Sequence, residues 1–454
     1  VLFLCAGILT PKEMLEGFSN KGMITVALLF LVSEGIRQSG TLGQVIKKLL
    51  PQGKTTVFKA QLRILPSVAF ISAFLNNTPV VVIFAPIIKH WAKSVNLPAT
   101  KFLIPLSYVT ILGGICTLIG TSTNLVVHGM ILEAGFEGFS MFELGKVGIF
   151  IAIAGIIYIF LFSKRLLPDA RPDTAVPDEE IEEGEKFHRV EAVLGARFPG
   201  INKKLKDFNF QRHYGAEVKE IKTRNGQRFV SNLEEVVLHE GDTLVVMADD
   251  TFIPTWGESS VFVLLTNGNE PDTTGKKKRW FALLLLVLMI VGATVGELPV
   301  TKEMFPDIKL DMFFFVSITT IIMAWTNLFP ARKYTKYISW DILITIACAF
   351  AISKAMVNSG VADSVAKFII GLSDDYGPHV LLAMVFIITN LFTELITNNA
   401  AAALAFPLAL SISAQLGVSP TPFFVVICMA ASASFSTPIG YQTNLIVQGI
   451  GNYK

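Results

Sequence analysis

A polar motif set in apolar sequence occurs twice in this chain, about 320 residues apart. The first copy runs from Thr117 to Leu125 as TLIGTSTNL, and the second runs from Thr437 to Leu445 as TPIGYQTNL. Two further matches share nearly the same offset: Phe30-x-x-Ser33 with Phe350-x-x-Ser353, and Asn77 followed by Pro86 with Asn398 followed by Pro407. Because a chance match would have to occur three times at one offset, the pattern predicts two copies of one structural unit.

The composition indicates where such units fold. Of 454 residues, 52% are hydrophobic and only 16% are charged, whereas ordinary soluble domains carry about a quarter charged residues. Most of the charge lies between Ser163 and Arg279, and the net charge is only +2. These values exclude a purely soluble enzyme, a disordered chain and a nucleic-acid binder. They predict a polytopic membrane protein with a soluble insert, divided into residues 1–166, 167–278 and 279–454. We expect both ends of the chain to lack residues of a longer protein.

The orientation follows from the placement of Lys and Arg. Lys164 and Arg165 precede the insert and the basic run 276–279 follows it, so the insert is predicted to be cytoplasmic and the protein to lie in the plasma (inner) membrane. The apolar segments 64–91 and 380–410 each contain an Asn pair, and we interpret them as re-entrant hairpins. About five crossings then separate the two copies, and an odd number inverts one relative to the other. Secondary transporters are commonly built this way.

The insert reads as a small α+β domain. Its acidic run, residues 178–183, is interpreted as a solvated tether, and Asn225-Gly226 predicts a type I′ turn between two strands. A further strand is predicted over Thr243–Met247. The stretch 187–253 resembles the C-terminal ligand-sensing domain of potassium-channel and transporter regulators (the TrkA-C or RCK-C type). That resemblance implies dimerisation and makes a nucleotide a candidate regulator.

The candidate site consists of uncharged side chains in two clusters. Asn76, Asn77 and Thr78 form the first, and Thr397, Asn398 and Asn399 form the second. Polar groups inside a bilayer are costly unless they are paired or functional. An Asn side chain offers an oxygen to a hard cation and an NH2 group to an anion. The alternative interpretation is that both clusters are polar contacts between helices.

Two broken helices are expected to complete this site. Breaks at Gly120 and Gly440 would expose carbonyl oxygens to sodium, and the N-terminal ends of half-helices favour an oxyanion. Because neither cluster contains Lys or Arg, a bound cation would have to offset much of the anion's charge. That requirement is a physical reason for coupled transport of the two ions.

At these motifs the chain resembles the divalent anion/sodium symporter family (DASS, the SLC13-type transporters) of the ion transporter superfamily. That family has Ser-Asn-Thr at each hairpin tip, and both clusters here keep the central Asn. The resemblance implies an all-α polytopic fold with inverted repeats and two re-entrant hairpins, an elevator movement and a homodimer. It implies Na⁺ sites at Ser72, Asn77 and Gly120 and at Thr393, Asn398 and Gly440. It places the substrate against Asn77, Thr78, Asn398, Asn399, Thr121 and Ser122.

The chain also departs from that family. Members that carry dicarboxylates often have a Pro-rich turn before the Asn of the broken helix, whereas this chain has Thr121-Ser122 and Tyr441-Gln442 at those places. The bulk of Tyr441 is expected to shrink the pocket. Together with the RCK-like insert, this pattern favours sulfate over a dicarboxylate as the divalent anion.

Other functions stay open at this point. A cation/proton antiporter of the same superfamily would use a titratable group, for which Glu394 is the candidate relay. The alternative for Glu394 is a carboxylate that caps neighbouring backbone. An ion channel gated by the RCK-like insert is a third hypothesis. No nucleophile elbow, phosphate-binding loop or zinc signature is found in the sequence, so the chain is not predicted to be an enzyme.

Overall fold

The computed structural model describes residues 2–169, 187–195, 197–223, 227–249, 252–256, 261–266, 276–305, 308–371, 377–437, 440–451 and 453. Within these residues, five helices are long and apolar enough to cross a bilayer. A bent pair, Ala331–Tyr337 with Ile342–Asn358, raises the number to six if it forms one span. The polytopic membrane protein predicted from the composition is thereby confirmed.

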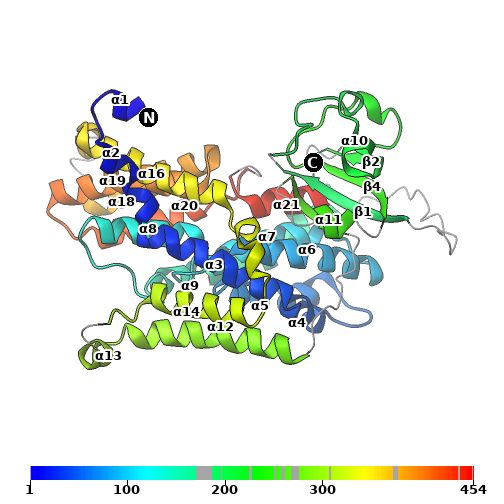
Figure 1. The fold of residues 1–454 in the computed structure, drawn as a ribbon, viewed down its shortest axis with the longest axis horizontal. Helices are drawn as coiled ribbons and strands as arrows, with labels where there is room; N and C mark the ends of the chain where they lie inside the picture. Colours follow the sequence, from blue (N-terminus) through cyan, green and yellow to red (C-terminus); the bar gives the residue numbers. More distant parts are fainter. Residues whose placement is uncertain are drawn as a thin grey trace.

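Along the chain, helices precede and follow the insert, which lies at the upper right in Figure 1. Before the insert, the helices are α1 Leu2–Cys5, α2 Pro11–Glu16, α3 Lys21–Gln38, α4 Thr41–Leu49, α5 Val57–Ser72, α6 Asn77–Ser94, α7 Thr100–Gly114, α8 Ser122–Glu133 and α9 Gly145–Leu166. After it, they are α12 Lys276–Gly296, α13 Pro299–Met304, α14 Met312–Trp325, α15 Tyr334–Tyr337, α16 Trp340–Asn358, α17 Val361–Gly371, α18 Pro378–Leu395, α19 Asn398–Leu416, α20 Thr421–Ser432 and α21 Gln442–Gly451.

The insert is an α+β unit, as predicted. Its elements are β1 Phe187–Leu194, α10 Phe210–Tyr214, β2 Glu217–Lys222, β3 Arg228–Phe229, β4 Thr243–Asp249, α11 Phe252–Trp256 and β5 Phe262–Thr266. The strands form one antiparallel sheet in the order β3-β2-β4-β1-β5. Aromatic side chains, among them Phe198, Phe210 and Tyr214, fill a core of its own. The acidic run 178–183 and Asn225-Gly226 lie outside the described residues.

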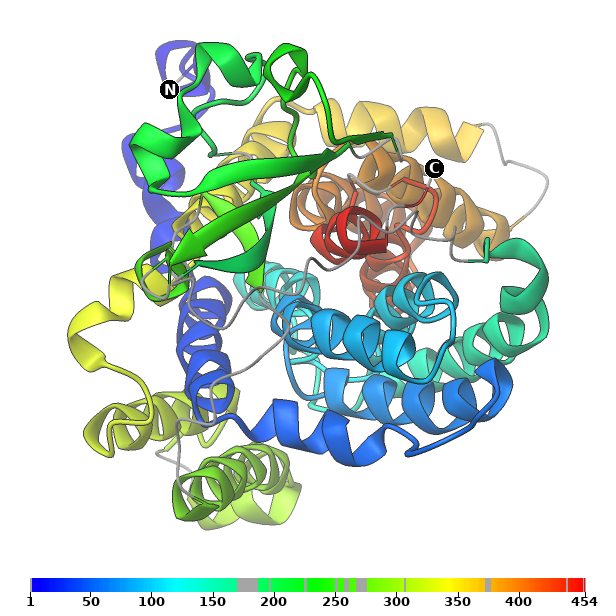
Figure 2. The same cartoon turned by 90° about the vertical axis from the view of Figure 1, so that its right-hand side faces the viewer.

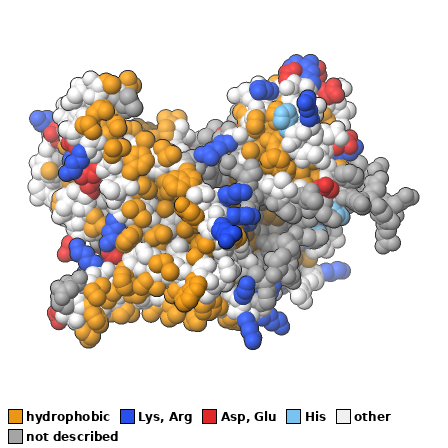
Figure 3. Space-filling view, viewed as in Figure 1, with side chains coloured by type: hydrophobic (Ala, Val, Ile, Leu, Met, Phe, Trp, Pro, Cys, Tyr) orange, Lys and Arg blue, Asp and Glu red, His pale blue; other side chains and the backbone are white. Residues whose placement is uncertain are grey.

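The outer surface of the helical part suits a bilayer. Along α9 and α12, large apolar side chains such as Phe150, Leu161 and Leu288 are more than half exposed. Hydrophobic side chains cover much of the face in Figure 3, including its lower edge, where α12 runs in Figure 1. Because soluble proteins rarely expose continuous apolar surfaces of this extent, we assign this surface to lipid.

Four interruptions divide the helices that carry the sequence motifs. We call residues 73–76, between α5 and α6, the first turn, and residues 396–397, between α18 and α19, the second turn. Residues 115–121, between α7 and α8, are the first break, and residues 433–441, between α20 and α21, are the second break. The broken helices predicted at Gly120 and Gly440 are therefore confirmed, and each predicted Asn pair lies where its helix is interrupted.

Close backbone contact holds the first turn against the first break. A Cβ added to Gly113 in α7 would lie 2.1 Å from the carbonyl oxygen of Ala69 in α5. Only glycine allows the two helices to approach so closely. This contact positions the end of α5 beside the residues at which α7 ends.

Candidate functional site

The N-terminal ends of four helices meet in the helical part. They belong to α6, α8, α19 and α21, which begin at Asn77, Ser122, Asn398 and Gln442. Helix α21 packs on α6, and α8 packs on α19. Each helix that follows a turn therefore contacts the half-helix that follows the break of the other repeat copy.

The hydroxyl of Tyr441 lies at the centre of this meeting point. In the orientation that satisfies all its partners, the Asn77 amide accepts from this hydroxyl at 2.6 Å and donates to Ser72 Oγ at 2.8 Å. The Thr121 hydroxyl lies 3.0 Å from the same Tyr441 oxygen, and the Asn398 side chain lies near it. Tyr441 is buried, so its hydroxyl joins both Asn clusters away from solvent.

Two further contacts link the repeat copies in equivalent ways. The hydroxyl of Ser122 donates to Asn399 Oδ1 at 3.2 Å, and the hydroxyl of Thr78 donates to Gln442 Oε1 at 3.3 Å. At the repeat offset, Ser122 corresponds to Gln442 and Thr78 to Asn399. The sequence repeat is therefore accompanied by a repeat of contacts.

Equivalent hydrogen bonds hold the two breaks in place. Asn124 Nδ2 donates to the carbonyls of Thr117 at 2.8 Å and Gly114 at 3.3 Å. Asn444 Nδ2 donates to the equivalent carbonyls, those of Thr437 at 3.4 Å and Ser434 at 2.8 Å. An Asn at the start of each half-helix thus closes a loop of broken backbone whose carbonyls would otherwise lack partners.

The side-chain oxygens of Asn444 and Asn124 differ in their hydrogen bonding. Asn444 Oδ1 accepts a hydrogen bond from Ser107 at 2.7 Å. Asn124 Oδ1 is buried and has no hydrogen-bond partner among the described residues. Since buried polar atoms nearly always have a hydrogen-bond partner, this oxygen is a candidate ligand atom.

The predicted sodium residues come together in two groups. Asn77 Nδ2 lies 2.8 Å from Ser72 Oγ and 3.3 Å from the carbonyl oxygen of Gly120. At the other group, a Cβ added to Gly440 would lie 2.7 Å from the carbonyl oxygen of Thr393. Asn398 lies near Tyr441, the residue after Gly440. Each group offers a hydroxyl and a backbone carbonyl oxygen, which are ligands suited to a hard cation, whereas Asn77 in this conformation turns its NH2 group toward Ser72 and Gly120 and its oxygen toward Tyr441.

Glu394 caps the second break, as one of the two sequence-based interpretations predicts. Its carboxylate accepts from the backbone N–H groups of Phe435, Ser436 and Thr437 at 3.1, 3.1 and 2.9 Å. It also accepts from the hydroxyl of Thr437 at 2.8 Å. A carboxyl group with this many donors fixes the conformation of the loop.

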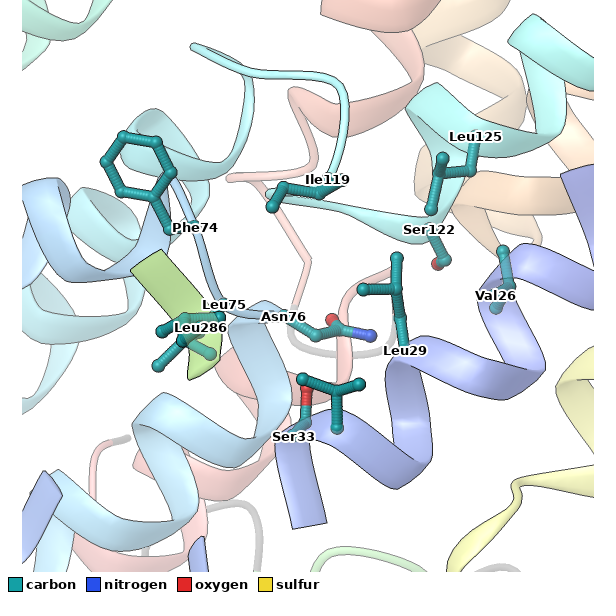
Figure 4. Close-up of a pocket in the computed structure, with 11 residues that line it drawn as sticks. Val26, Leu29, Ser33, Phe74, Leu75, Asn76, Ile119, Ser122, Leu125 and Leu286 are labelled. Carbon is teal, nitrogen blue, oxygen red and sulfur yellow. The ribbon is translucent and has the colours of Figure 1, made fainter. Parts of the chain in front are cut away.

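A small cavity lies beside the first turn (Figure 4). Asn76, Ser122 and Ser33 supply its polar lining, and its volume is about 10 Å³. Such a volume is close to that of a single water. In this conformation the cavity is therefore too small for sulfate or a dicarboxylate.

The structure brings the predicted substrate residues together at or beside the N-terminal ends of these four helices, and sequence reasoning missed the central position of Tyr441. It treated this residue only as a bulky neighbour. The repeat contained the signal, since Tyr441 occupies the position of Thr121, which was itself predicted to lie beside the substrate. Ser107 and Thr110, whose hydroxyl or carbonyl supports Asn444 and Asn77, carry no sequence signal.

The chain is similar in sequence to several transporters. An uncharacterized transporter of Synechocystis sp. is 28% identical over all of this chain and 88% of its own length. Sodium/sulfate cotransporter 2 of Chlamydomonas reinhardtii is 31% identical over 59% of this chain and 30% of its own length. A sodium-dependent dicarboxylate transporter of Staphylococcus saprophyticus is 28% identical over 26% of this chain and 23% of its own length.

The profile of the citrate transporter family, CitMHS, matches residues 1–430. This match covers both Asn clusters, the first break and the insert. It ends just before the residues of the second break. The chain therefore belongs to the citrate transporter family.

Proposed function

We propose that this protein is a sodium-coupled symporter of a small divalent oxyanion, with sulfate favoured and a dicarboxylate next. The observation that carries the proposal is the convergence of the N-terminal ends of α6, α8, α19 and α21 on one uncharged, hydrogen-bonding site. Each such end carries a partial positive charge, and at α19 the side chain of Thr397 caps the N–H group of Ala400. The N-cap residues of α6 and α8, Asn76 and Thr121, make no side-chain cap, so the first N–H groups of these two helices are available to an anion.

Sodium supplies the positive charge that the side chains of the site lack. The first sodium site comprises Ser72, Asn77 and the carbonyl of Gly120, and we add Asn124, whose buried Oδ1 has no partner among the described residues. The second comprises Thr393, Asn398 and the carbonyl of Gly440. The substrate lies between them, against Asn77, Thr78, Asn398, Asn399, Thr121 and Ser122. Each ion lowers the cost of desolvating the other, because none of these residues is charged.

In this mechanism, the described conformation is a closed one. The Tyr441 hydroxyl occupies the space between Asn77 and Thr121, where one oxygen of the anion would be bound. In the absence of substrate, the side chains of Asn77 and Thr121 therefore contact the Tyr441 hydroxyl instead. Entry of the anion requires that α21 and α6 separate enough for the Tyr441 side chain to change rotamer and leave the site.

The wider architecture follows from the repeat. The α5–α6 and α18–α19 units are re-entrant hairpins that open to opposite sides. Once the anion is bound and α6 and α21 have closed on it, the hairpins move with the broken helices as one body in an elevator movement. The insert is cytoplasmic, and the protein works as a homodimer in the plasma membrane. Two relatives from Chlamydomonas reinhardtii are named sodium/sulfate cotransporters, which supports the choice of ions.

A thermal-shift screen tests the proposal. The purified protein is heated with sulfate, selenate, succinate or citrate, in sodium chloride or in potassium chloride of equal ionic strength. Stabilisation grows with the ratio of ligand concentration to Kd, so an increase in Tm that requires both sodium and sulfate supports the symporter. Equal increases in sodium and potassium would contradict it.

Uptake into liposomes then separates the three mechanisms. Sulfate uptake that needs an inward sodium gradient supports symport. Cation exchange driven by protons supports an antiporter, and single-channel currents support a channel.

A further inference from the structure

The first strand of the insert presents alternate side chains to two different surroundings. Val190, Ala192 and Leu194 are buried in the core of the insert. Val193 is also buried, but it belongs to the core of the helical part. Because alternate residues of a strand point to opposite faces, Glu191 and Val193 share the face of β1 that is turned toward the helices.

An ion pair fixes this face to α6. Lys89 Nζ lies 2.8 and 2.9 Å from the two carboxylate oxygens of Glu191. Both side chains are largely buried, with exposed fractions of 30% for Lys89 and 17% for Glu191. Lys222 of β2 contacts the same carboxylate at 3.3 Å. Glu191 thus joins the sheet of the insert to a helix that begins with Asn77.

Two glycines bring the insert against α21. A Cβ added to Gly449 of α21 would lie 3.0 Å from the carbonyl oxygen of Gly241 and 3.0 Å from Thr243 Oγ1. A Cβ added to Gly241 would lie 2.6 Å from Leu445. Figure 2 shows the sheet of the insert lying close to α21, which is drawn in red. The approach is close enough that a side chain at Gly449 would press against the backbone of the insert.

The insert therefore holds the far ends of two helices whose near ends form the candidate site. On α6, Lys89 is twelve positions beyond Asn77, which is about 18 Å along an α-helix. At the near ends, Thr78 of α6 contacts Gln442 of α21. Helices α6 and α21 are thus joined at the site and bridged again by the insert.

We propose that the docked insert is a brake on transport. The inference rests on the proposed symport, in which α6 and α21 must separate to admit the anion. While the insert bridges Lys89 and Gly449, separation of the two helices must also break the ion pair and the contact between the glycines. Undocking of the insert removes this additional cost and raises the rate of transport.

Substitutions on each side of the interface test the brake. Lys89→Met and Glu191→Gln are each expected to raise the initial rate of sodium-driven sulfate uptake roughly two- to fivefold, the range for a partly exposed ion pair. The double variant is expected to match the single variants, since both remove one interaction. Gly449→Val, which leaves the insert unchanged, is expected to act in the same direction.

The Lys204–Glu235 pair provides the control. Its nitrogen and oxygen lie 2.8 Å apart, and both residues belong to the insert and are exposed. Lys204→Met is therefore expected to leave the uptake rate unchanged. Rates that do not rise in Lys89→Met and Glu191→Gln, or that rise equally in Lys204→Met, would overturn the brake.

A disulfide tests docking without relying on charge. Thr243→Cys and Gly449→Cys are combined in a protein whose four cysteines, Cys5, Cys116, Cys348 and Cys428, are replaced by serine. We expect the bridge to form readily and to lower uptake at least about fivefold, with recovery after reduction. A low yield of the bridge would overturn the docking itself, whatever the transport result. A high yield with no sodium-driven uptake in any variant would instead overturn the proposed function.

Discussion

The side chains of Asn77 and Tyr441 lie 2.6 Å apart, although 364 positions separate them in the sequence. Asn77 begins α6 in the first half of the chain, and Tyr441 precedes α21 in the second half. Their contact places the two repeat copies against each other at the residues that the motifs single out. Most of the following predictions test this pair and its surroundings.

Replacement of the central asparagines is expected to abolish transport. Asn77→Ala and Asn398→Ala each remove an amide that serves the sodium and the anion, so sodium-driven sulfate uptake should fall to background. Asn77→Ala also leaves buried partners unpaired, at a cost of about 1–3 kcal/mol, which should leave the protein folded at a lower Tm. Asn358→Ala, at an exposed position of α16, is the control. Sodium-dependent uptake retained in both variants would refute the site.

A smaller residue at position 441 is expected to change the preferred anion. Tyr441→Ser removes the ring that fills the space between Asn77, Thr121 and Asn398, and it keeps a hydroxyl. We expect succinate to compete with sulfate uptake at a concentration roughly tenfold lower than in the unmodified protein. Tyr158→Ser, on the exposed surface of α9, serves as control. An unchanged ratio of the two anions would show that Tyr441 does not limit the pocket.

Neutralisation of Glu394 distinguishes capping from relay. In Glu394→Gln an NH2 group faces backbone N–H donors, so the second break loses its cap. We expect Tm to fall by an amount equivalent to about 2 kcal/mol, typical of hydrogen bonds to a charged group, and uptake to fall with it. A relay would give a different pattern, in which Tm is unchanged and the dependence of uptake on pH disappears.

Docking of the insert is expected to change with pH only under acidic conditions, where Glu191 becomes protonated. Burial by itself raises the pKa of Glu191, but Lys89 and Lys222 outweigh it and lower the pKa to about 2. Because docking lowers the pKa of Glu191, its ionised carboxylate stabilises the docked state fully above the usual Glu pKa of about 4.5. This stabilisation is lost progressively as the pH falls toward 2. Spin labels at His90→Cys and Lys219→Cys, in the cysteine-free protein, should therefore report one distance between pH 8 and 5 and a second one near pH 3. A change between pH 8 and 6 would contradict this account.

The contact between α5 and α7 predicts a stability difference between two glycines. Gly113→Ala would force the carbonyl of Ala69 away and should destabilise the protein by about 1–3 kcal/mol. Gly371→Ala is the matched control, because a Cβ at that helical position meets no atom within 4 Å. Its Tm should be unchanged or slightly raised. The comparison requires only thermal unfolding in detergent.

Several features could be predicted from residues alone because they depend on local sequence. The long apolar runs with few charges indicate spans, the charged block indicates the insert, and the interrupted motifs at Gly120 and Gly440 indicate broken helices. The repeat further indicated that the two broken motifs, residues 117–125 and 437–445, are equivalent. The hydrogen bonds of Asn124 and Asn444 bear this out, since they close the two breaks through equivalent carbonyls.

Other features depended on contacts between distant elements. No local pattern indicates that Tyr441 rather than Thr121 links both clusters, because its role comes from the packing of α21 on α6. The partners of Glu394 likewise depend on the path of the second break, and sequence reasoning could only name capping as one of two choices.

Residues alone indicated which segments are apolar enough to enter a membrane, where helices break and which uncharged groups lie at the breaks, because hydrophobicity and backbone conformation are properties of short stretches. The folded chain was needed to show that these groups meet around one tyrosine hydroxyl and that the insert docks on α6 and α21. Those relationships join residues hundreds of positions apart, and the close packing of helix on helix and of sheet on helix selects them.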